Sequence, residues 1–279
     1  MTNQIYPCLW FDGQAKEAAD FYCAIFKNSR VTTNSPMIVN FELDGKKFMG
    51  LNGGPMFKIN PSISIFATFE SIDETNFIWN KLIDGGKALI EIDKQDWSAR
   101  YGWLQDKFGL TWQISVVNNQ GDKAKITPSM LFTNDKFGKA EEAINFYTST
   151  FDDSKIDQIS HYPENTPFEG KIMYAEFNLR KHDFIGMDGP GNHEYAFNEG
   201  VSIVVNCKNQ AEIDHYWDNL SGNGGQESQC GWLKDKFGVS WQIVPTVLGE
   251  LMNNPEKGQR VMQVVMQSKK FDIEKLKNA

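Results

Sequence analysis

A 14-residue motif occurs twice in this 279-residue chain. Residues 102–115 read GWLQDKFGLTWQIS, and residues 231–244 read GWLKDKFGVSWQIV. Three further pairs of segments match in the same order: YPCLWF with TPSMLF, KEAADFYCAIFKNSRV with EEAINFYTSTFDDSKI, and KFMGLNGGP with DFIGMDGP. Matches in one order, at separations of 121 to 136 residues, indicate a tandem duplication with small insertions and deletions. The chain is therefore predicted to fold as two copies of one domain.

The repeat also predicts the domain boundaries. We expect a first domain over residues 1–117, a linker over 118–125, a second domain over 126–249 and a tail over 250–279. The linker reads NNQGDKAK, which has no apolar periodicity and carries glycine and charges. The tail has apolar residues at helical spacing between Val261 and Leu276, which predicts one or two amphipathic helices. These helices pack on the body, bridge the halves or, through their methionines, bind a partner.

Each half shows the pattern strand, helix, strand, strand twice over. In the first half the predicted strands cover residues 5–11, 37–43, 47–51, 62–69, 101–105 and 110–117, and the predicted helices cover 14–26 and 73–82. Asp44 and Gly45 form the tight turn of a hairpin, because this dipeptide adopts the positive φ angles of a primed turn. The second half repeats the order through strand 201–207, helix 210–220 and the strands within 231–244. The fold class is α+β, with room for one more short strand in each unit.

Charge and composition narrow the function classes. The 28 Lys and Arg residues against 36 Asp and Glu residues give a net charge of −8, the wrong sign for a protein that neutralises phosphates, so no nucleic acid partner is expected. No signal-like or membrane-spanning apolar run occurs, which predicts a cytoplasmic protein with no membrane partner. The four cysteines stand far apart and form neither a disulfide framework nor a zinc cluster.

These motifs together resemble the vicinal-oxygen-chelate superfamily, which includes glyoxalases, bleomycin-resistance proteins and dioxygenases. The segments PCLWFDGQAKEAADFY, FELDGKKFMGLNGGP and QCGWLKDKFGVSWQIVP resemble its PhnB-like subfamily more narrowly. The resemblance implies two tandem glyoxalase-like domains, each made of paired βαβββ units whose curved mixed sheet encloses a cleft. It also implies that the fused halves replace the homodimer of single-domain relatives, so the chain is a monomer with pseudo-dimeric halves or a homodimer.

Members of this superfamily hold a divalent metal with His and Glu side chains on the cleft strands. The matching positions here fall at Tyr6 or Pro7 and at Thr127 or Pro128 on the first strands, near Ser64 and Ser202 on the next units, and on Gln113 and Gln242 on the last strands. None of these is an imidazole or a carboxylate. All four histidines, at positions 161, 182, 193 and 215, lie in the second half without ligand spacing. We therefore expect no metal and no cofactor.

Strand alternation then predicts which side chains line the clefts. If Gln113 points into a cleft, Thr111 and Ser115 share its face while Trp112 points to the helices. The predicted lining consists of neutral side chains, namely Gln113, Gln242, Ser64, Phe66, Thr68, Ser202 and Asn206. Trp103 and Trp232 are further candidates for stacking on a planar ligand, although both also suit a structural role. Cys230 is a candidate through its thiol, and Asp106 and Asp235 are expected to cap the turns before the last strands.

Two functions remain open on these residues. The preferred interpretation is a protein that binds a small, largely uncharged or aromatic molecule in a metal-free cleft. The alternative is an enzyme, either a divalent-metal lyase or dioxygenase or, from the name that proteins of this subfamily often carry, a demethylubiquinone-type methyltransferase. The glycine-rich stretches do not follow the strand, turn and helix order of a dinucleotide-type site, and no acid and base pair stands out.

Overall fold

The computed structural model describes residues 4–117 and 124–279. The first half contains β1 (Ile5–Phe11), α1 (Ala15–Ile25), β2 (Arg30–Asn34), β3 (Ile38–Leu43), β4 (Lys46–Asn52), β5 (Ile63–Phe69), α2 (Ile72–Leu82), β6 (Lys87–Gln95), β7 (Ser98–Gln105) and β8 (Thr111–Val116). The second half contains β9 (Lys125–Phe132), η1 (Asn134–Lys136), α3 (Ala140–Thr150), β10 (Lys155–His161), β11 (Ile172–Leu179), β12 (His182–Asp188), β13 (Val201–Cys207), α4 (Gln210–Ser221), β14 (Gln226–Glu227), β15 (Trp232–Lys234) and β16 (Ser240–Pro245). The predicted α+β fold of two glyoxalase-like halves is confirmed.

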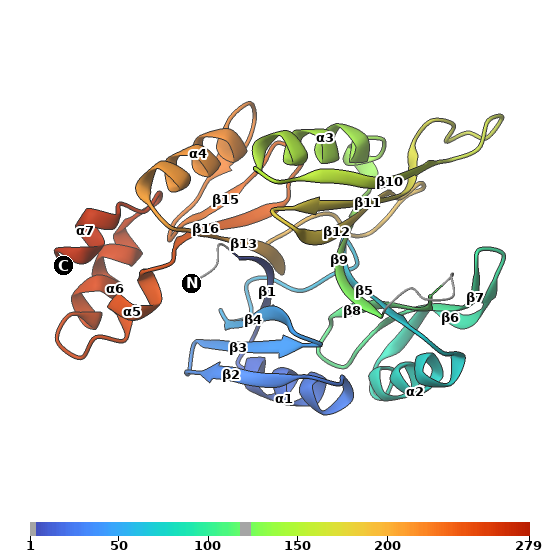
Figure 1. Cartoon of the computed structure of the whole chain (residues 1–279), viewed down its shortest axis with the longest axis horizontal. Helices are drawn as coiled ribbons and strands as arrows, with labels where there is room; N and C mark the ends of the chain where they lie inside the picture. The colour runs from blue at the N-terminus through green and yellow to red at the C-terminus, as the bar shows by residue number, and fades with distance from the viewer. Residues whose placement is uncertain (1–3, 118–123) are drawn as a thin grey trace.

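The strands form two mixed sheets of eight strands each. The first sheet has the order β14-β15-β16-β13-β1-β4-β3-β2, and the second sheet has the order β10-β11-β12-β9-β5-β8-β7-β6. Each sheet therefore combines one unit from each half, joined by the antiparallel pairs β1–β13 and β5–β9. In Figure 1 the first half, coloured blue to teal, lies below the second half, coloured green to red, and these central pairs connect them. Both clefts consequently contain residues from both halves, a pairing that the repeat itself does not specify.

The turn chemistry of the sequence appears where it was predicted. Asp44 and Gly45 join β3 to β4 with φ angles of 47° and 73°, as a primed hairpin turn requires. The strands that the sequence left unspecified are β2 and β6, each at the edge of its sheet. The expected linker at 118–125 falls mostly outside the described residues, and Lys125 is already the first residue of β9.

The helices pack on the sheet face opposite the clefts, and each half has its core there. Ala15, Ala18, Ala19 and Tyr22 of α1 are buried, and α1 makes its main packing contacts with β3. On the strands, apolar side chains such as Phe41 and Trp112 point to this core, while the alternate residues point to the cleft. On α2, Trp79 is buried, whereas Phe77 is 54% exposed.

The tail forms three short helices, α5 (Leu248–Met252), α6 (Gly258–Gln267) and α7 (Ile273–Lys277). It docks on the second half, beside α4 in Figure 1. The Gln210 side chain donates to the Phe271 carbonyl at 3.0 Å and accepts from the Ile273 backbone N–H at 3.0 Å. Of the predicted arrangements, the structure has the one in which the tail packs on the body. None of the helices in the described ranges combines the length and apolar character needed to cross a membrane.

Candidate functional site

Each sheet has a cleft face, defined as the face opposite its helices. The cleft face of the second sheet, here called the second cleft, carries Gln113 at its centre. The Gln113 amide oxygen accepts from the Tyr101 hydroxyl at 2.9 Å, and its nitrogen donates to the Ser64 hydroxyl at 2.8 Å and approaches the Ser129 hydroxyl at 3.4 Å. Gln113 is only 4% exposed, and its amide is satisfied by these protein groups. The network forms a closed polar floor beneath the cleft.

The cleft face of the first sheet, the first cleft, has a similar but more apolar floor. The Gln242 side chain donates to the Ser202 hydroxyl at 2.9 Å. Cys8 takes the place that Ser129 has in the second cleft, and it also hydrogen-bonds Gln242 and Ser202. Burial raises the pKa of the Cys8 thiol to about 12, so the thiol stays protonated at neutral pH.

These floors do not fit the divalent metal that the superfamily fold implies. The groups present are amides, serine hydroxyls and one protonated thiol, whereas a catalytic metal site requires imidazole or carboxylate ligands. The Gln113 side-chain nitrogen donates toward the Ser64 and Ser129 hydroxyls. A metal ion at this place would need a lone pair from the ligand, and an amide nitrogen offers none. Over the residues that the structure describes, no group of three or more His, Cys, Asp and Glu side chains could hold a metal ion.

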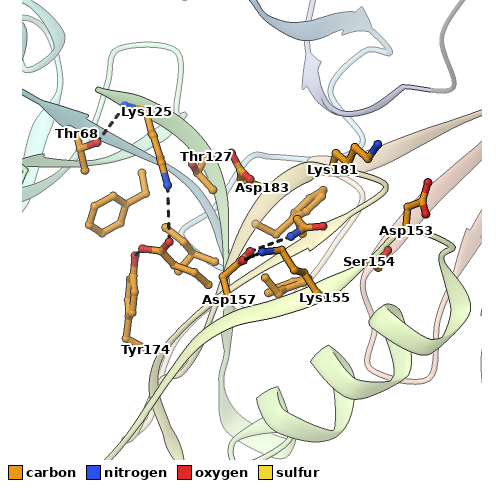
Figure 2. A pocket seen from close by; sticks show the side chains of 16 residues that line it. Thr68, Lys125, Thr127, Asp153, Ser154, Lys155, Asp157, Tyr174, Lys181 and Asp183 are labelled. Carbon is orange, nitrogen blue, oxygen red and sulfur yellow. Dashed lines mark hydrogen bonds and ion pairs between the residues drawn. The ribbon is translucent and has the colours of Figure 1, made fainter. Parts of the chain in front are cut away.

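A cavity of about 600 Å³ lies on the second cleft, mainly over β9, β11 and β12. The side chains of its inner wall are Phe66, Thr68, Thr127, Tyr174 and Ile185, and those of its outer wall include Lys125, Asp157, Glu176, Lys181 and Asp183. Figure 2 shows Lys125 reaching from β9 toward the Glu176 carboxylate, with Thr127 and Asp183 on the same side of the cavity. The inner wall is neutral and partly aromatic, and the charges gather at the rim.

Four aromatic rings form a row across the second cleft. The ring centroids of Trp97 and Tyr101 lie 4.6 Å apart, those of Tyr101 and Phe66 6.2 Å apart, and those of Phe66 and Tyr174 6.3 Å apart. Trp97 stands in the turn between the long strands β6 and β7 and is 52% exposed, while Tyr174 comes from β11 of the other half. Trp103 packs against this row, and its buried indole N–H has no hydrogen-bond partner in the described part of the chain.

The rim on the Tyr174 side is held by charge-assisted contacts. The Tyr174 hydroxyl donates to Glu176 at 2.7 Å, and Lys125 lies 3.9 Å from the same carboxylate. Burial, together with the Glu176 carboxylate, raises the pKa of Tyr174 above its ordinary value, so this phenol remains a hydrogen-bond donor. Asp157 is bound by Asn178 at 2.8 Å and by Lys155. Glu176 and Asp157 therefore each have a cationic partner on the rim.

The structure divides the predicted site residues between the two clefts. Phe66 and Thr68 line the cavity, whereas Gln113 and Ser64 belong to the buried network of the second cleft and do not line the cavity. Trp103 packs against the aromatic row. The residues of the first cleft are Ser202, Asn206, Gln242 and Trp232. The ring of Trp232 meets Trp10 at 5.9 Å, edge to face.

Cys230 is held in a turn against the tail. Its backbone N–H donates to the Ser268 carbonyl at 2.7 Å, and its sulfur lies 3.9 Å from that of Met266. Burial raises the pKa of the Cys230 thiol, which disfavours a thiolate. No basic group is hydrogen-bonded to this thiol in the described residues.

Tyr101, Tyr174 and Cys8 escaped the sequence reasoning, whereas Tyr6 and Thr127 were already among the first-strand positions that the resemblance selected. Tyr101 and Tyr174 complete the aromatic row, Thr127 opens the cavity, and Tyr6 and Cys8 cover the first cleft. The signal for Cys8 was present in the first strand. Alternation along this strand puts Tyr6 and Cys8 on the cleft face and Pro7 on the opposite face. Of the two residues considered for the first-strand position, Tyr6 therefore points into the cleft and Pro7 points away from it.

The fold of this chain is the glyoxalase-like fold, present in two tandem copies. The structure of glyoxalase I from Zea mays is similar over 86% of this chain and 92% of its own length, with a TM-score of 0.54 and 10% identity, which supports the fold alone. A family model described as 3-demethylubiquinone-9 3-methyltransferase matches residues 3–115 and again residues 124–244. The chain belongs to this family, which is the PhnB-like group.

One relative of that family is a PhnB protein from Bacillus cereus. It is 29% identical and covers 39% of this chain and 96% of its own, with a TM-score of 0.38. A mutant of the Zea mays glyoxalase I, solved in another crystal form, gives a TM-score of 0.56 at 11% identity, over 86% of this chain and 92% of its own. No curated protein matches this sequence.

Proposed function

We propose that this protein binds one small, largely uncharged aromatic molecule in the second cleft, without a metal ion. The observation that carries the proposal is the cavity of about 600 Å³, which lies within the size range of small-molecule sites. Its inner wall presents the Phe66 and Tyr174 rings together with the Thr68 and Thr127 hydroxyls. Such a wall favours a planar ring that carries a polar substituent, because stacking and one or two hydrogen bonds are both available.

The rim argues for a ligand without a full charge. Its acidic side chains Glu176 and Asp157 already have cationic partners in Lys125 and Lys155. A charged ligand that bound at either carboxylate would compete with its ion pair and lose its own hydration at the same time. The name of the family concerns a demethylubiquinone, which has a planar, oxygen-substituted ring, and a planar ring of that kind suits this wall. We propose binding of such a ring and assign no methyl transfer to it.

Titration with 2-naphthol, a neutral fluorescent phenol, tests the proposal. We expect saturable binding by calorimetry, and binding at least tenfold weaker for the charged analogue 2-naphthalenesulfonate. Phe66→Ala and Tyr174→Leu should each weaken 2-naphthol binding, whereas Phe77→Ala, which removes a ring that is 54% exposed on α2, should leave it unchanged. Equal binding of both probes, or no binding of either, contradicts the proposal.

The metal-free part of the proposal has its own test. We expect the melting temperature to stay constant when Mn²⁺, Ni²⁺, Zn²⁺ or Fe²⁺ is added. A metal ion raises the melting temperature only if it binds the folded state more tightly than the unfolded state, and the proposal predicts no such binding. Elemental analysis of untagged protein should show metal well below one equivalent. A melting temperature that rises with the logarithm of the metal concentration would direct attention to lyase and dioxygenase chemistry.

A further inference from the structure

The two clefts differ at one pair of positions that the repeat makes equivalent. YPCLWF aligns with TPSMLF, so Tyr6 on β1 corresponds to Thr127 on β9. The sheet register agrees, because Tyr6 pairs with Val204 on β13 and Thr127 pairs with Phe66 on β5. One cleft thus has a phenol ring at the position where the other has a small hydroxyl.

The Tyr6 ring fills the first cleft. It is 5% exposed and packs with Cys8 and Val204, with Met49, Leu51 and Val244 around them. The Lys47 ammonium lies 4.1 Å from the ring centroid, in the geometry of a cation–π contact. The Asn206 side chain hydrogen-bonds the Tyr6 hydroxyl. In this cleft the Tyr6 side chain therefore occupies the space that a phenol ligand could take.

The corresponding space in the second cleft belongs to the cavity. Thr127 lines the cavity, as do Phe66 and Ile185, which correspond to Val204 and Met49 in the first cleft. Thr68 corresponds to Asn206, the partner of the Tyr6 hydroxyl. The Thr68 oxygen accepts from the Lys125 backbone N–H at 3.0 Å, so its own proton remains available to a ligand.

We infer that the ligand of the second cleft is a phenol whose ring occupies the space equivalent to that of Tyr6, with its oxygen at Thr68, and that the chain binds one such molecule. This inference rests on the proposed function and makes it specific. It follows from the pseudo-symmetry, because one cleft contains the ring in its own sequence and the other keeps the space and the polar partner. The ring would stack on Phe66 where Tyr6 meets Val204.

The probe for this inference is 4-methylphenol, which has the structure of a tyrosine side chain. We expect wild-type protein to bind one equivalent, to bind toluene at least tenfold more weakly, and to lose tenfold or more in affinity for 4-methylphenol in Thr68→Val. Thr127→Tyr should abolish binding while keeping or raising the melting temperature, because the new ring fills the cavity. The matched control Thr32→Tyr, an exposed position on the edge strand β2, should bind like wild type.

A second variant tests the equivalence from the other side. Tyr6→Thr should lower the melting temperature, and 4-methylphenol should restore it and bind with two equivalents per chain. The inference is overturned if Thr127→Tyr still binds 4-methylphenol, if wild type binds two equivalents, or if toluene binds as well as the phenol. Binding of 2-naphthol alone with none of 4-methylphenol would overturn the inference and keep the proposed function, whereas binding of neither would overturn both.

Discussion

The helix-side cores of the two halves are nearly identical, whereas their clefts are not. In the first half, the Asp106 carboxylate accepts from the Tyr22 hydroxyl at 2.8 Å and from the Trp112 indole at 2.9 Å. In the second half, Asp235 accepts from Tyr147 at 2.7 Å and from Trp241 at 2.8 Å. Each carboxylate also accepts two backbone N–H groups of the turn before the last strand, as its predicted capping role requires.

On the cleft side the equivalent residues have different sizes and charges. Tyr6 corresponds to Thr127 and Lys47 to Asp183, and in the second unit the strands β6 and β7 of nine and eight residues correspond to β14 and β15 of two and three. The difference shows which part of the repeat the fold requires. Four donors that converge on one buried carboxylate admit few substitutions, because each would leave donors unsatisfied. The residues above the floors, such as Tyr6 and Thr127, meet no such demand, and one cleft can fill while the other stays open.

Removal of either buried carboxylate should give the largest effect and should be equal in the two halves. Asp106→Ala leaves two backbone N–H groups, a phenol and an indole without their acceptor, and we expect a loss of about 3–5 kcal/mol in the free energy of unfolding. Asp235→Ala should cost the same within about 1 kcal/mol, because the network repeats contact for contact. Chemical denaturation measures both. As a control, Glu17→Ala on the exposed side of α1 should change stability by less than about 0.5 kcal/mol.

The same carboxylates predict a pH dependence. Burial raises the pKa of both Asp106 and Asp235 from 3.8 to about 6, against the opposing effect of their four donors. Between pH 4 and 6 the folded state therefore holds protons that the unfolded state has released. Each carboxyl should lower the free energy of unfolding by roughly 3 kcal/mol as pH rises across this window, and add no further change above it.

The measurement is denaturant unfolding from pH 4 to pH 7 for wild type and for Asp106→Asn. Asparagine cannot titrate, so the wild-type curve should fall more steeply by the contribution of one carboxyl. Exposed carboxylates such as Glu142, whose pKa is lowered by Lys236, act in the opposite direction and remain in both proteins. Parallel curves for the two proteins would show that Asp106 stays ionised through this range. In that case the four hydrogen bonds would lower the pKa of Asp106 by more than burial raises it.

The sequence predicted the repeated core. Trp112 and Trp241 occupy equivalent positions of the two copies, and both are buried. Alternation also predicted that Ser64, Phe66 and Thr68 share one face of their strand. In the structure Ser64 hydrogen-bonds Gln113, and Phe66 and Thr68 line the cavity. Local patterns carry this information because they depend on one strand at a time.

The remaining site residues depend on pairing between distant segments. The contact of β5 with β9 brings Thr127 and Tyr174 of one half beside Phe66 of the other, and no local pattern specifies that β5 pairs with β9 rather than within its own half. Tyr101 reaches the site because β7 is part of a long hairpin. The equivalent residue in the other copy, Cys230, lies just before β15, a strand of only three residues. The predictive signal that was present and unused is the alternation of Tyr6, Pro7 and Cys8.

Substitutions in the floors of the two clefts should differ in their cost to stability, with smaller effects than the loss of a buried carboxylate. Gln113→Leu leaves the Tyr101 hydroxyl and two serines without their partner, for an expected cost of about 2–3 kcal/mol. Gln242→Leu removes a contact to Ser202 and the thiol of Cys8 beside it, for about 1 kcal/mol. Equal losses would mean that the two floors are energetically equivalent despite their different partners.

Thiol reactivity of the wild-type protein gives the mildest test. Cys8 is 1% exposed beneath the Tyr6 ring, and burial raises its pKa to about 12, so both access and thiolate formation are suppressed. Cys23 and Cys230 are partly exposed, and we expect only these two to react with a disulfide reagent such as 5,5′-dithiobis(2-nitrobenzoate) in folded protein at pH 7.5. Cys8 and the buried Cys207 should react after denaturation. If Cys8 instead reacted as fast as Cys230, and Tyr6→Thr failed to accelerate it further, the first cleft would be open to solvent and the contrast between the two clefts would fail.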